Sequence, residues 1–152
     1  MTTLTIRTAR RQDVPAIVRM LADDPLGARR ERFADPLPDC YWRAFDVIEG
    51  DPHNEIVVAE QDGRVVGCLQ ITFIPGLTRQ GMTRAQIEGV RVDGSMRGAG
   101  VGRQLVLEAL DRARERGCGM VQLTTDKSRA EAHRFYEALG FVATHEGMKL
   151  EL

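Results

Sequence analysis

The sequence predicts a mixed α/β fold, in which helices pack on the faces of one central sheet. Segments with strand and helix patterns follow one another in the order β, α, α, three strands, α, β, α, β. The pair Asp62-Gly63 is a strong hairpin signal between two of the strand segments. A further strand segment runs through a glycine-rich turn, residues 98–102, directly into a long amphipathic helix. Together these features predict a mixed sheet covered by helices.

Length and composition fit one domain, residues 1–152, with a core of its own. Of the 152 residues 43% are apolar, and the formal net charge is −1. That charge gives no reason to expect nucleic acid or a membrane surface as a partner, and no apolar run is long enough to cross a bilayer. The three cysteines form no C-x-x-C pair, and the N-terminus lacks a signal-peptide core. We therefore expect a cytoplasmic protein without a metal.

The first half of the chain predicts two helices and a hairpin. Asp13 is the expected N-cap of the first helix, with Pro15 in its first turn. Apolar residues at helical spacing predict the second helix over residues 39–49. The strands of this half are expected at residues 4–7, 56–60 and 65–73.

The stretch between the two helices contains several acidic residues. They would attract a cationic substrate, but arginines are interspersed among them, and a solvated face is the favoured interpretation. The acidic residues are Asp23, Asp24, Glu31, Asp35 and Asp39.

Residues 83–93 form a predicted strand whose apolar pattern changes phase. Its apolar residues occupy odd positions before Glu88 and even positions after Gly89. Such a slip predicts burial on both faces or a β-bulge, and a glycine at this point favours the bulge. The apolar residues are Ala85, Ile87, Val90 and Val92.

Three glycines, Gly98, Gly100 and Gly102, lie at every second position where the next predicted helix begins. Glycine lets the backbone approach a ligand closely, and the first amides of a helix have no partner within the helix. Together they predict an anion site, most often for phosphate. The residues do not match the dinucleotide-binding motif G-x-G-x-x-G, because Arg103 occupies the position of its third glycine. They do not match a P-loop either, because the sequence contains no Gly-Lys pair.

The last third of the chain predicts a strand, a helix and a closing strand pair. The preceding helix is expected to end near Arg116, stopped by Gly117. Gly140 should stop the short helix, with Phe141 packed back on its last turn. The expected elements are the strand 120–125, the helix 130–139 and the extended segments 141–144 and 148–152.

Two motifs resemble the GCN5-related N-acetyltransferases, the GNAT family. Arg97-Gly98-Ala99-Gly100-Val101-Gly102 is similar to the R-x-x-G-x-G pyrophosphate loop, and residues 132–141 are similar to A-x-x-F-Y-E-x-x-G-F. The resemblance covers roughly residues 85–141, while the first fifty residues carry no recognisable motif. It implies a mixed, mostly antiparallel twisted sheet of six to seven strands flanked by about four helices.

The resemblance implies direct transfer of acetyl from acetyl-CoA to a primary amine of a small molecule, in a ternary complex and without a metal. Two alternatives stay open, namely a protein or peptide amine as acceptor, and an acyl-CoA-binding module without catalysis. By analogy with the family, a homodimer is expected.

The resemblance also assigns roles to single residues. Glu88 is the expected base, and a glutamate that merely lies on the surface is an equally good interpretation. Tyr136 is the expected acid, and the alternative is a tyrosine that packs in the core. The backbone N–H of Val90 is the expected oxyanion donor. Val90 and Val92 would pair with the pantetheine amides. The residues expected at the cofactor's phosphates are Arg97, Gly98, Gly100, Val101, Gly102 and Arg103.

One position departs from the family pattern. Arg129 stands where the family often has an asparagine, which leaves Ser128 or Arg129 as a substitute contact. The surrounding pattern is reminiscent of a branch that includes aminoalkylphosphonate acetyltransferases. His133 is a candidate acid or metal ligand, but an exposed helical histidine is the favoured interpretation.

Overall fold

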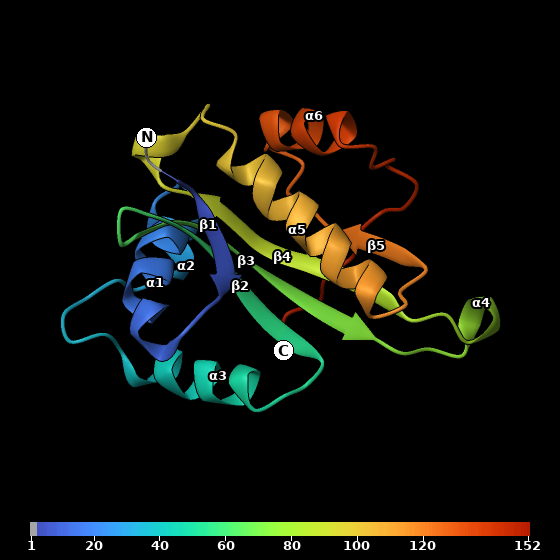
Figure 1. Ribbon diagram of the computed structural model, residues 1–152, viewed down its shortest axis with the longest axis horizontal. Coiled ribbons are helices and arrows are strands. Elements are labelled where there is room, and N and C mark those ends of the chain that lie inside the picture. The colour runs from blue at the N-terminus through green and yellow to red at the C-terminus, as the bar shows by residue number, and fades with distance from the viewer. Residues whose placement is uncertain (1–2) are drawn as a thin grey trace. The chain divides into compact units, whose positions relative to one another are not determined.

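The computed structural model describes residues 3–152, and within them one sheet has five strands in the order β1-β2-β3-β4-β5 (Figure 1). The chain forms two compact units, one reaching to Gln122 and one from Leu123 to Leu152. The strands are β1 (Thr5–Thr8), β2 (Asn54–Gln61), β3 (Arg64–Ile74), β4 (Arg84–Val92) and β5 (Met120–Leu123).

The mixed α/β class is confirmed, with more helices and fewer strands than predicted. Two of the helices have only four residues, and in α4 both Arg79 and Gln80 have positive φ values of 54° and 60°. The segment of α4 is therefore a tight polar turn. The helices are α1 (Val14–Ala22), α2 (Gly27–Arg30), α3 (Asp39–Glu49), α4 (Thr78–Gly81), α5 (Val101–Glu115) and α6 (Ala130–Ala138), with 3-10 turns η1 (Arg11–Asp13) and η2 (Gly94–Met96).

The sheet is antiparallel from β1 to β4 and parallel between β4 and β5. The N–H of Gly119 donates to the carbonyl of Thr83 at 2.9 Å, and the side chain of Gln122 bonds that of Gln86 at 2.9 Å. The two residues of each contact are separated by the same number of positions in the sequence, so β4 and β5 run in the same direction. β5 ends at Leu123, and β4 therefore continues past the end of β5 from about Glu88 onward.

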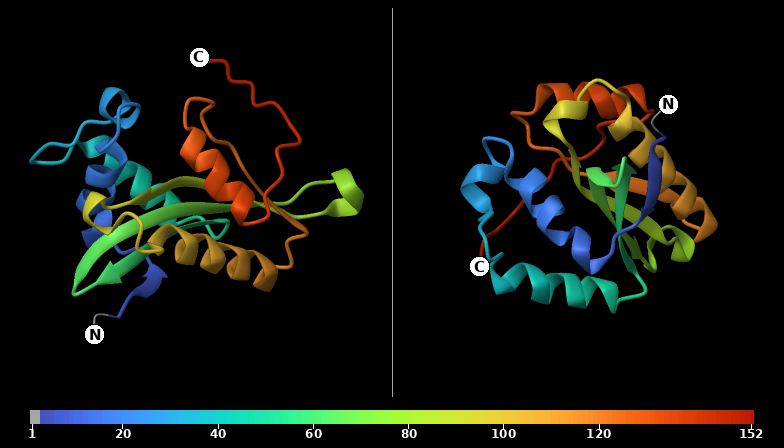
Figure 2. Two further views of the ribbon diagram at one scale, coloured as in Figure 1. Left: turned by 90° about the horizontal axis from the view of Figure 1, so that it is seen from above. Right: turned by 60° about the vertical axis from the view of Figure 1, so that its left-hand side comes forward.

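Helices cover both faces of the sheet (Figure 2). Helix α5 packs so closely on β3 that a Cβ added to Gly67 would lie 2.8 Å from Leu105 and 2.9 Å from Val101. Helices α1 and α3 pack on the other face around Val58 and Cys68. Burying one such aliphatic side chain stabilises the fold by about 1.5–3 kcal/mol. These two apolar layers fix the position of β4.

Strand β4 contains the predicted bulge. Between two flanking pairs the ladder skips one position, so that Gly89 and Val90 both oppose Leu69. Gly89 has a φ of 62°, a left-handed conformation that glycine adopts without a steric penalty. The thiol of Cys68 donates to the carbonyl of Gly89 at 3.7 Å. The flanking pairs are Cys68↔Arg91 and Gln70↔Glu88.

The bulge explains the change of phase along β4. Because one residue is inserted, Val90 and Val92 share a face with Ala85 and Ile87, towards α5. The apolar residues of this strand thus stay on one face throughout. Glu88 points to the opposite face.

Helix ends follow the sequence closely. Helix α3 spans Asp39–Glu49, as predicted. Helix α6 ends in a Schellman motif, with the N–H of Gly140 bonded to Glu137 at 3.0 Å and that of Phe141 to Tyr136 at 3.1 Å. The rings of Tyr136 and Phe141 lie 5.8 Å apart, edge to face. Gly117 ends α5 in the same way.

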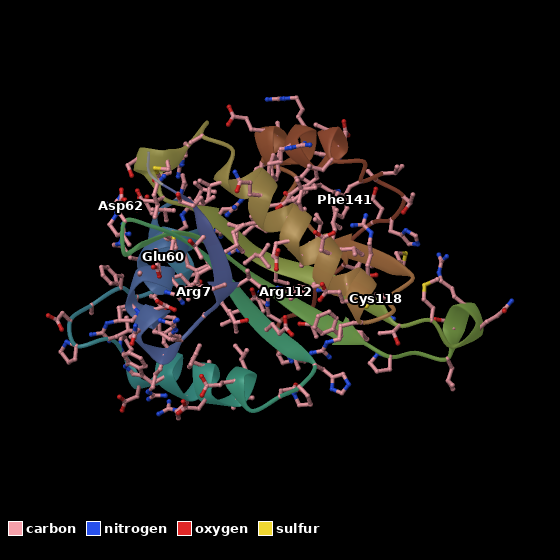
Figure 3. The ribbon with its side chains drawn as sticks, viewed as in Figure 1. Arg7, Glu60, Asp62, Arg112, Cys118 and Phe141 are labelled. Carbon is pink, nitrogen blue, oxygen red and sulfur yellow. The ribbon has the colours of Figure 1, made fainter. Side chains whose placement is uncertain are left out.

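Asp13 occupies the N-cap position of α1, as predicted, but its side chain makes no capping hydrogen bond. Its side chain is buried and instead accepts hydrogen bonds from Arg7, at 2.7 and 3.0 Å, and from the N–H of Arg10, at 2.7 Å. Arg7 also pairs with Glu60 (Figure 3). A partly buried ion-pair network therefore joins β1, β2 and the start of α1. The bonds from Arg7 and Arg10 thus take the place of a side-chain cap on α1.

The closing strand pair is also wrong, and it accounts for the shortfall in strands. Residues 141–152 contain no strand. Their alternating apolar residues Met148, Leu150 and Leu152 are 94%, 86% and 118% exposed. Alternation makes a segment compatible with a strand, but a strand forms only beside a partner edge.

Candidate active site

The bulge of β4 places an acidic side chain at an open position. Glu88 is the last residue before the bulge, and its side chain is exposed. A Cβ added to Gly89 would lie 3.7 Å from a methyl group of Leu21, so the end of α1 borders the bulge. Val90 and Val92 are half-buried, in the part of β4 that continues past the end of β5. Their backbone groups on that side therefore have no β5 ladder to join.

Two ion pairs tie the α1–α2 segment to β4. Nε of Arg91 lies 3.4 Å from a carboxylate oxygen of Asp24, and Arg19 donates to Asp93 at 2.9 Å. The side chain and backbone N–H of Ser95, together with Arg19, hold the pKa of Asp93 well below its ordinary value. Asp93 is buried, so this pairing fixes the entry to the glycine loop.

The glycine loop has a conformation that only glycine adopts freely. Gly98 and Gly100 have φ values of 83° and 82°, and a Cβ added to either would meet no atom within 4 Å. Arg97 and Arg103, which flank these positions, are exposed. The loop is therefore open to a ligand, and positive charge lies beside it.

Helix α5 begins directly after this loop and presents unpaired amides. The N–H of Gln104 makes the first bond of the helix, to the carbonyl of Gly100 at 3.1 Å. The amides of Val101, Gly102 and Arg103 precede it and have no partner within the helix. The side chain of Val101 is buried in the core, so only its backbone is available to a ligand. These amides, at the positive end of the helix dipole, fit a diphosphate.

The comparisons with known proteins agree with this geometry. Residues 16–141 match the Acetyltransferase (GNAT) family. The chain belongs to the GNAT family. This confirms the family and the acetyltransferase class that the two motifs predicted.

Three relatives of this GNAT protein illustrate the likeness. A crystal structure from Bacillus halodurans C-125, described as a transcriptional regulator, is 54% identical, has a TM-score of 0.96, and matches 99% of this chain and 100% of that one. Glucosamine 6-phosphate N-acetyltransferase of Trypanosoma brucei brucei is 39% identical over 99 residues, 65% of each chain. Aminoalkylphosphonate N-acetyltransferase of Salmonella typhimurium is 32% identical over 95 residues, 62% of this chain and 61% of the relative. This chain thus matches less than two thirds of either curated relative.

Tyr136 lies in the second unit, on α6. Its ring packs edge to face on Phe135 at 5.1 Å and on Phe141 at 5.8 Å, and the residue is half-buried. Both the predicted acid and the alternative core tyrosine are compatible with this partial burial. Its assignment as the acid stays a prediction.

The residues at the family's asparagine position are held locally. Ser128 donates its hydroxyl and its N–H to a carboxylate oxygen of Asp126, at 2.6 and 2.9 Å. His133 is exposed and lies 3.3 Å from Glu137, one helical turn away. Among residues 3–152 no group of three His, Cys, Asp or Glu side chains is placed to hold a metal ion, and no helix is long and apolar enough to cross a membrane.

Two of the acidic residues before α3 are engaged within the fold. Asp24 pairs with Arg91 and accepts the N–H of Gly27, while Glu31 accepts the hydroxyl of Tyr41 at 2.9 Å. Burial, together with Glu31, raises the pKa of Tyr41. These two carboxylates are therefore occupied by protein partners.

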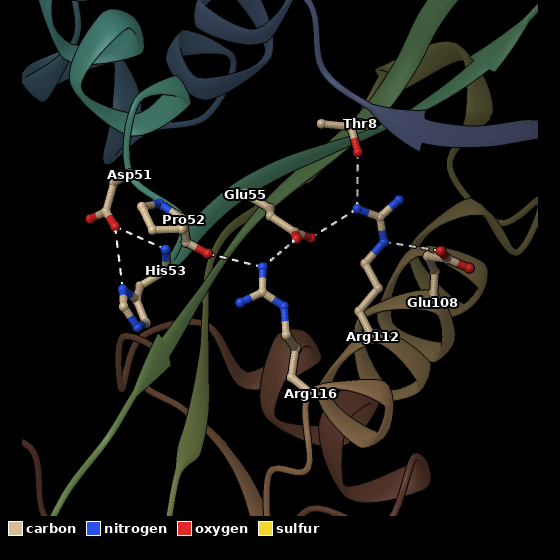
Figure 4. A network of polar contacts seen from close by, with 8 residues as sticks. All are labelled: Thr8, Asp51, Pro52, His53, Glu55, Glu108, Arg112 and Arg116. Atoms are coloured by element: carbon tan, nitrogen blue, oxygen red, sulfur yellow. Dashed lines mark hydrogen bonds and ion pairs between the residues drawn. The ribbon is translucent and has the colours of Figure 1, made fainter.

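Two cavities lie at the other end of α5, away from the glycine loop. One of about 420 Å³ is lined by a charged network in which Arg112 pairs with Glu55 at 2.9 Å and with Glu108 at 3.0 Å (Figure 4). Arg116 adds a bond to Glu55 at 3.1 Å and one to the carbonyl of Pro52 at 2.9 Å. The network joins β2 to α5, and no predicted site residue lines this cavity.

Sequence reasoning missed two side chains beside Glu88. Nε2 of Gln86 donates to Oε1 of Glu88 at 3.3 Å, and Nε2 of Gln122 donates to Oε1 of Gln86 at 2.9 Å. The contact of Gln86 with Glu88 could have been predicted from the sequence, because residues two apart on a strand share a face. The contact of Gln122 with Gln86 joins residues far apart in the sequence, and no pattern in the sequence indicates it.

Proposed function

We propose that this chain transfers an acetyl group from acetyl-CoA directly to the primary amine of a small molecule, in a ternary complex. The observation that carries the proposal is the bulge of β4 followed directly by the open glycine loop at the start of α5. The bulge offers a carboxylate and, at Val90 and Val92, backbone N–H groups beyond the end of β5, while the loop offers amides and arginines. Each is a feature that transfer from a nucleotide-linked thioester requires.

The proposed cofactor contacts divide between backbone and side chains. The diphosphate accepts hydrogen bonds from the backbone of the loop and of the first turn of α5, with charge supplied by Arg97 and Arg103. Val90 and Val92 pair through their backbone with the pantetheine amides, like an added strand. The backbone contacts fall at Gly98, Gly100, Val101 and Gly102.

The proposed chemistry assigns one proton or one hydrogen bond to each group. Bound acetyl-CoA supplies an acetyl group activated as a thioester. Glu88 takes a proton from the attacking amine, directly or through water, because an alkyl ammonium has a pKa of about 10 and must lose a proton to attack. The N–H of Val90 donates to the carbonyl oxygen. Tyr136 donates its proton to the leaving sulfur as the carbon–nitrogen bond replaces the carbon–sulfur bond.

Several broader points belong to the same proposal. The family match spans both compact units, which supports residues 1–152 acting as one acetyltransferase domain. The free cysteines Cys40, Cys68 and Cys118 fit a reducing cytoplasm. A homodimer stays a prediction.

The experiment is an amine-panel assay that follows release of the CoA thiol. The panel contains aminoalkylphosphonates, amino sugars and their phosphates, amino acids, polyamines and aminoglycosides, because two relatives are named for amines that carry phosphorus oxyanions. Tyr136→Phe should slow turnover and leave CoA affinity intact. Glu88→Gln should flatten the rise of rate with pH. If acetyl-CoA binds but CoA is never released with any amine, the catalytic proposal is overturned.

A second candidate is an acyl-CoA-binding module without turnover. The observation that favours it is the Bacillus halodurans relative described as a transcriptional regulator. In that case calorimetry finds acetyl-CoA binding of unchanged strength in Glu88→Gln and Tyr136→Phe. A protein amine as acceptor would instead appear as CoA release when a peptide is added to the panel.

A further inference from the structure

A row of polar side chains crosses the sheet on the same face as Glu88. Register places Thr72 opposite Gln86 and Gln70 opposite Glu88, and directly paired residues share a face. On the other side of β3, Asn54 pairs with Thr72. The row therefore crosses four strands: Asn54 on β2, Gln70 and Thr72 on β3, Gln86 and Glu88 on β4, and Gln122 on β5.

This row lies beside an apolar part of the same sheet face. On the same face α1 and α3 pack on Val58 and Cys68, and these two residues are buried. The members of the row other than Glu88 are half-buried, and they bond to one another. Half-buried amides in a sheet are costly unless their polar groups have partners, so the polar atoms that these bonds leave over are suited to a polar ligand.

The first set of bonds fixes which atoms of the row stay available. Nδ2 of Asn54 donates to Asp51 at 2.8 Å, which turns Oδ1 of Asn54 towards β3. That oxygen accepts Nε2 of Gln70 at 3.2 Å and the hydroxyl of Thr72 at 2.8 Å. The hydroxyl hydrogen of Thr72 and one N–H of Gln70 are then used. Oε1 of Gln70 and the lone pairs of Thr72 remain as acceptors, beside the second N–H of Gln70.

The second set of bonds fixes the carboxylate. Gln122 donates to Oε1 of Gln86, so Gln86 must present Nε2, a donor, to Glu88. This orients Oε1 of Glu88 and leaves Oε2 for another partner. The two sets end in acceptor oxygens on neighbouring positions of one face.

We propose that this polar row is the floor of the acceptor site and that it selects primary amines bearing several hydroxyl groups, as amino sugars do. Within the row, Gln86 is a positioning residue for Glu88. The inference rests on the proposed function and names its substrate class. Hydroxyl and amine groups donate hydrogen bonds, which matches the acceptors left on Gln70, Thr72 and Glu88. An amine without hydroxyls leaves those oxygens unpaired, a mismatch that enzymes reject strongly.

The test compares two amines of similar ring size, glucosamine and cyclohexylamine, in the CoA-release assay. Wild type should prefer glucosamine in kcat/KM by roughly tenfold or more. Gln70→Met keeps the size of the side chain and removes its acceptor, so it should raise KM for glucosamine roughly three- to tenfold and leave cyclohexylamine unchanged. Gln12→Met, an exposed glutamine in η1, is the matched control and should change neither.

Gln86→Met tests the positioning role. It should lower kcat for both amines, leave KM for acetyl-CoA unchanged and alter the pH–rate profile, which a merely structural change would not do. An unchanged profile with unchanged kcat overturns that role. An equal preference for the two amines in wild type, or an unchanged preference in Gln70→Met, overturns the acceptor floor.

The inference and the proposed function fail separately. If no amine releases CoA, calorimetry with glucosamine on the CoA complex still decides the inference. Binding that Gln70→Met weakens supports the acceptor floor, and absence of binding overturns it. Turnover without a preference for hydroxyl groups leaves the acetyltransferase proposal standing and removes the inference alone.

Discussion

Replacing Gly100 by valine tests the glycine loop most directly. The backbone there has a φ of 82°, and left-handed backbone costs an L-residue roughly 1–2 kcal/mol. No atom lies within 4 Å of the position that a Cβ would take. Without ligand, the substitution should therefore lower the stability by this backbone cost and little more. Urea denaturation should therefore give a free energy of unfolding lower by about 1–2 kcal/mol.

The loss of CoA binding should be larger than the loss of stability. A valine side chain occupies the open side of the loop and turns its amides away from the diphosphate. Each lost hydrogen bond to a charged group costs about 1.5–3 kcal/mol, which corresponds to roughly 10- to 150-fold in affinity. Steric exclusion adds to this, and calorimetry should then detect no CoA binding.

Gly63 supplies the matched control. It lies in the β2–β3 hairpin turn with a φ of 73°, and a Cβ there also meets no atom within 4 Å. Gly63→Val should lose about as much stability as Gly100→Val and keep full CoA affinity. If Gly100→Val binds CoA as the wild type does, the loop does not hold the diphosphate.

Three further substitutions or labels test the fold around the site. Gly27→Ala should cost about 1–3 kcal/mol or more in urea denaturation, because its Cβ would lie 1.8 Å from the carbonyl oxygen of Leu21. Asp93→Asn should cost about 1–3 kcal/mol at pH 7. The pKa of Asp93 is held low in the folded protein, so its contribution is present above the ordinary carboxylate pKa of about 3.9 and is lost as the pH falls below it. Burial raises the pKa of the Cys68 thiol to about 12, so alkylation at pH 8 should modify the exposed Cys40 and spare Cys68.

Each of these has a result that contradicts the reasoning. A Gly27→Ala protein as stable as wild type would mean that the α1–α2 turn is not as tight as described. A stability difference between Asp93→Asn and wild type that stays constant from pH 7 to pH 2 would remove the ion pair as its cause. Rapid alkylation of Cys68 without denaturant would show that the bulge opens readily.

Local chemistry made much of the fold predictable. The hairpin at Asp62-Gly63, the bulge at Gly89 and the Schellman ending at Gly140 each follow from a glycine at a position that needs positive φ. The limits of α3 follow from Pro38 before it and Gly50 after it. These features depend on neighbours in the sequence, and periodicity reports such neighbours directly.

Features that depend on distant partners were not predictable. The pair of Arg7 with Glu60 joins residues far apart in the sequence, and with it Asp13 bonds Arg7 in place of the predicted side-chain cap. The segment 148–152 alternates as a strand does but has no strand partner in the described structure. At the site, the sequence indicated the glycine loop and Glu88, while the contact of Gln122 with Gln86 depends on the order of strands.

The inserted residue in β4 reverses the parity of the strand, and this restricts how the protein can change. Upstream of Gly89 even-numbered side chains point away from α5, and downstream of it odd-numbered ones do. Deleting this glycine would restore a regular ladder, but it would turn either the acidic side chain inward or the two valines outward. Single-residue deletions here should therefore be far less tolerated than in the hairpin turn at Asp62, since one frame positions both the core valines and the proposed base.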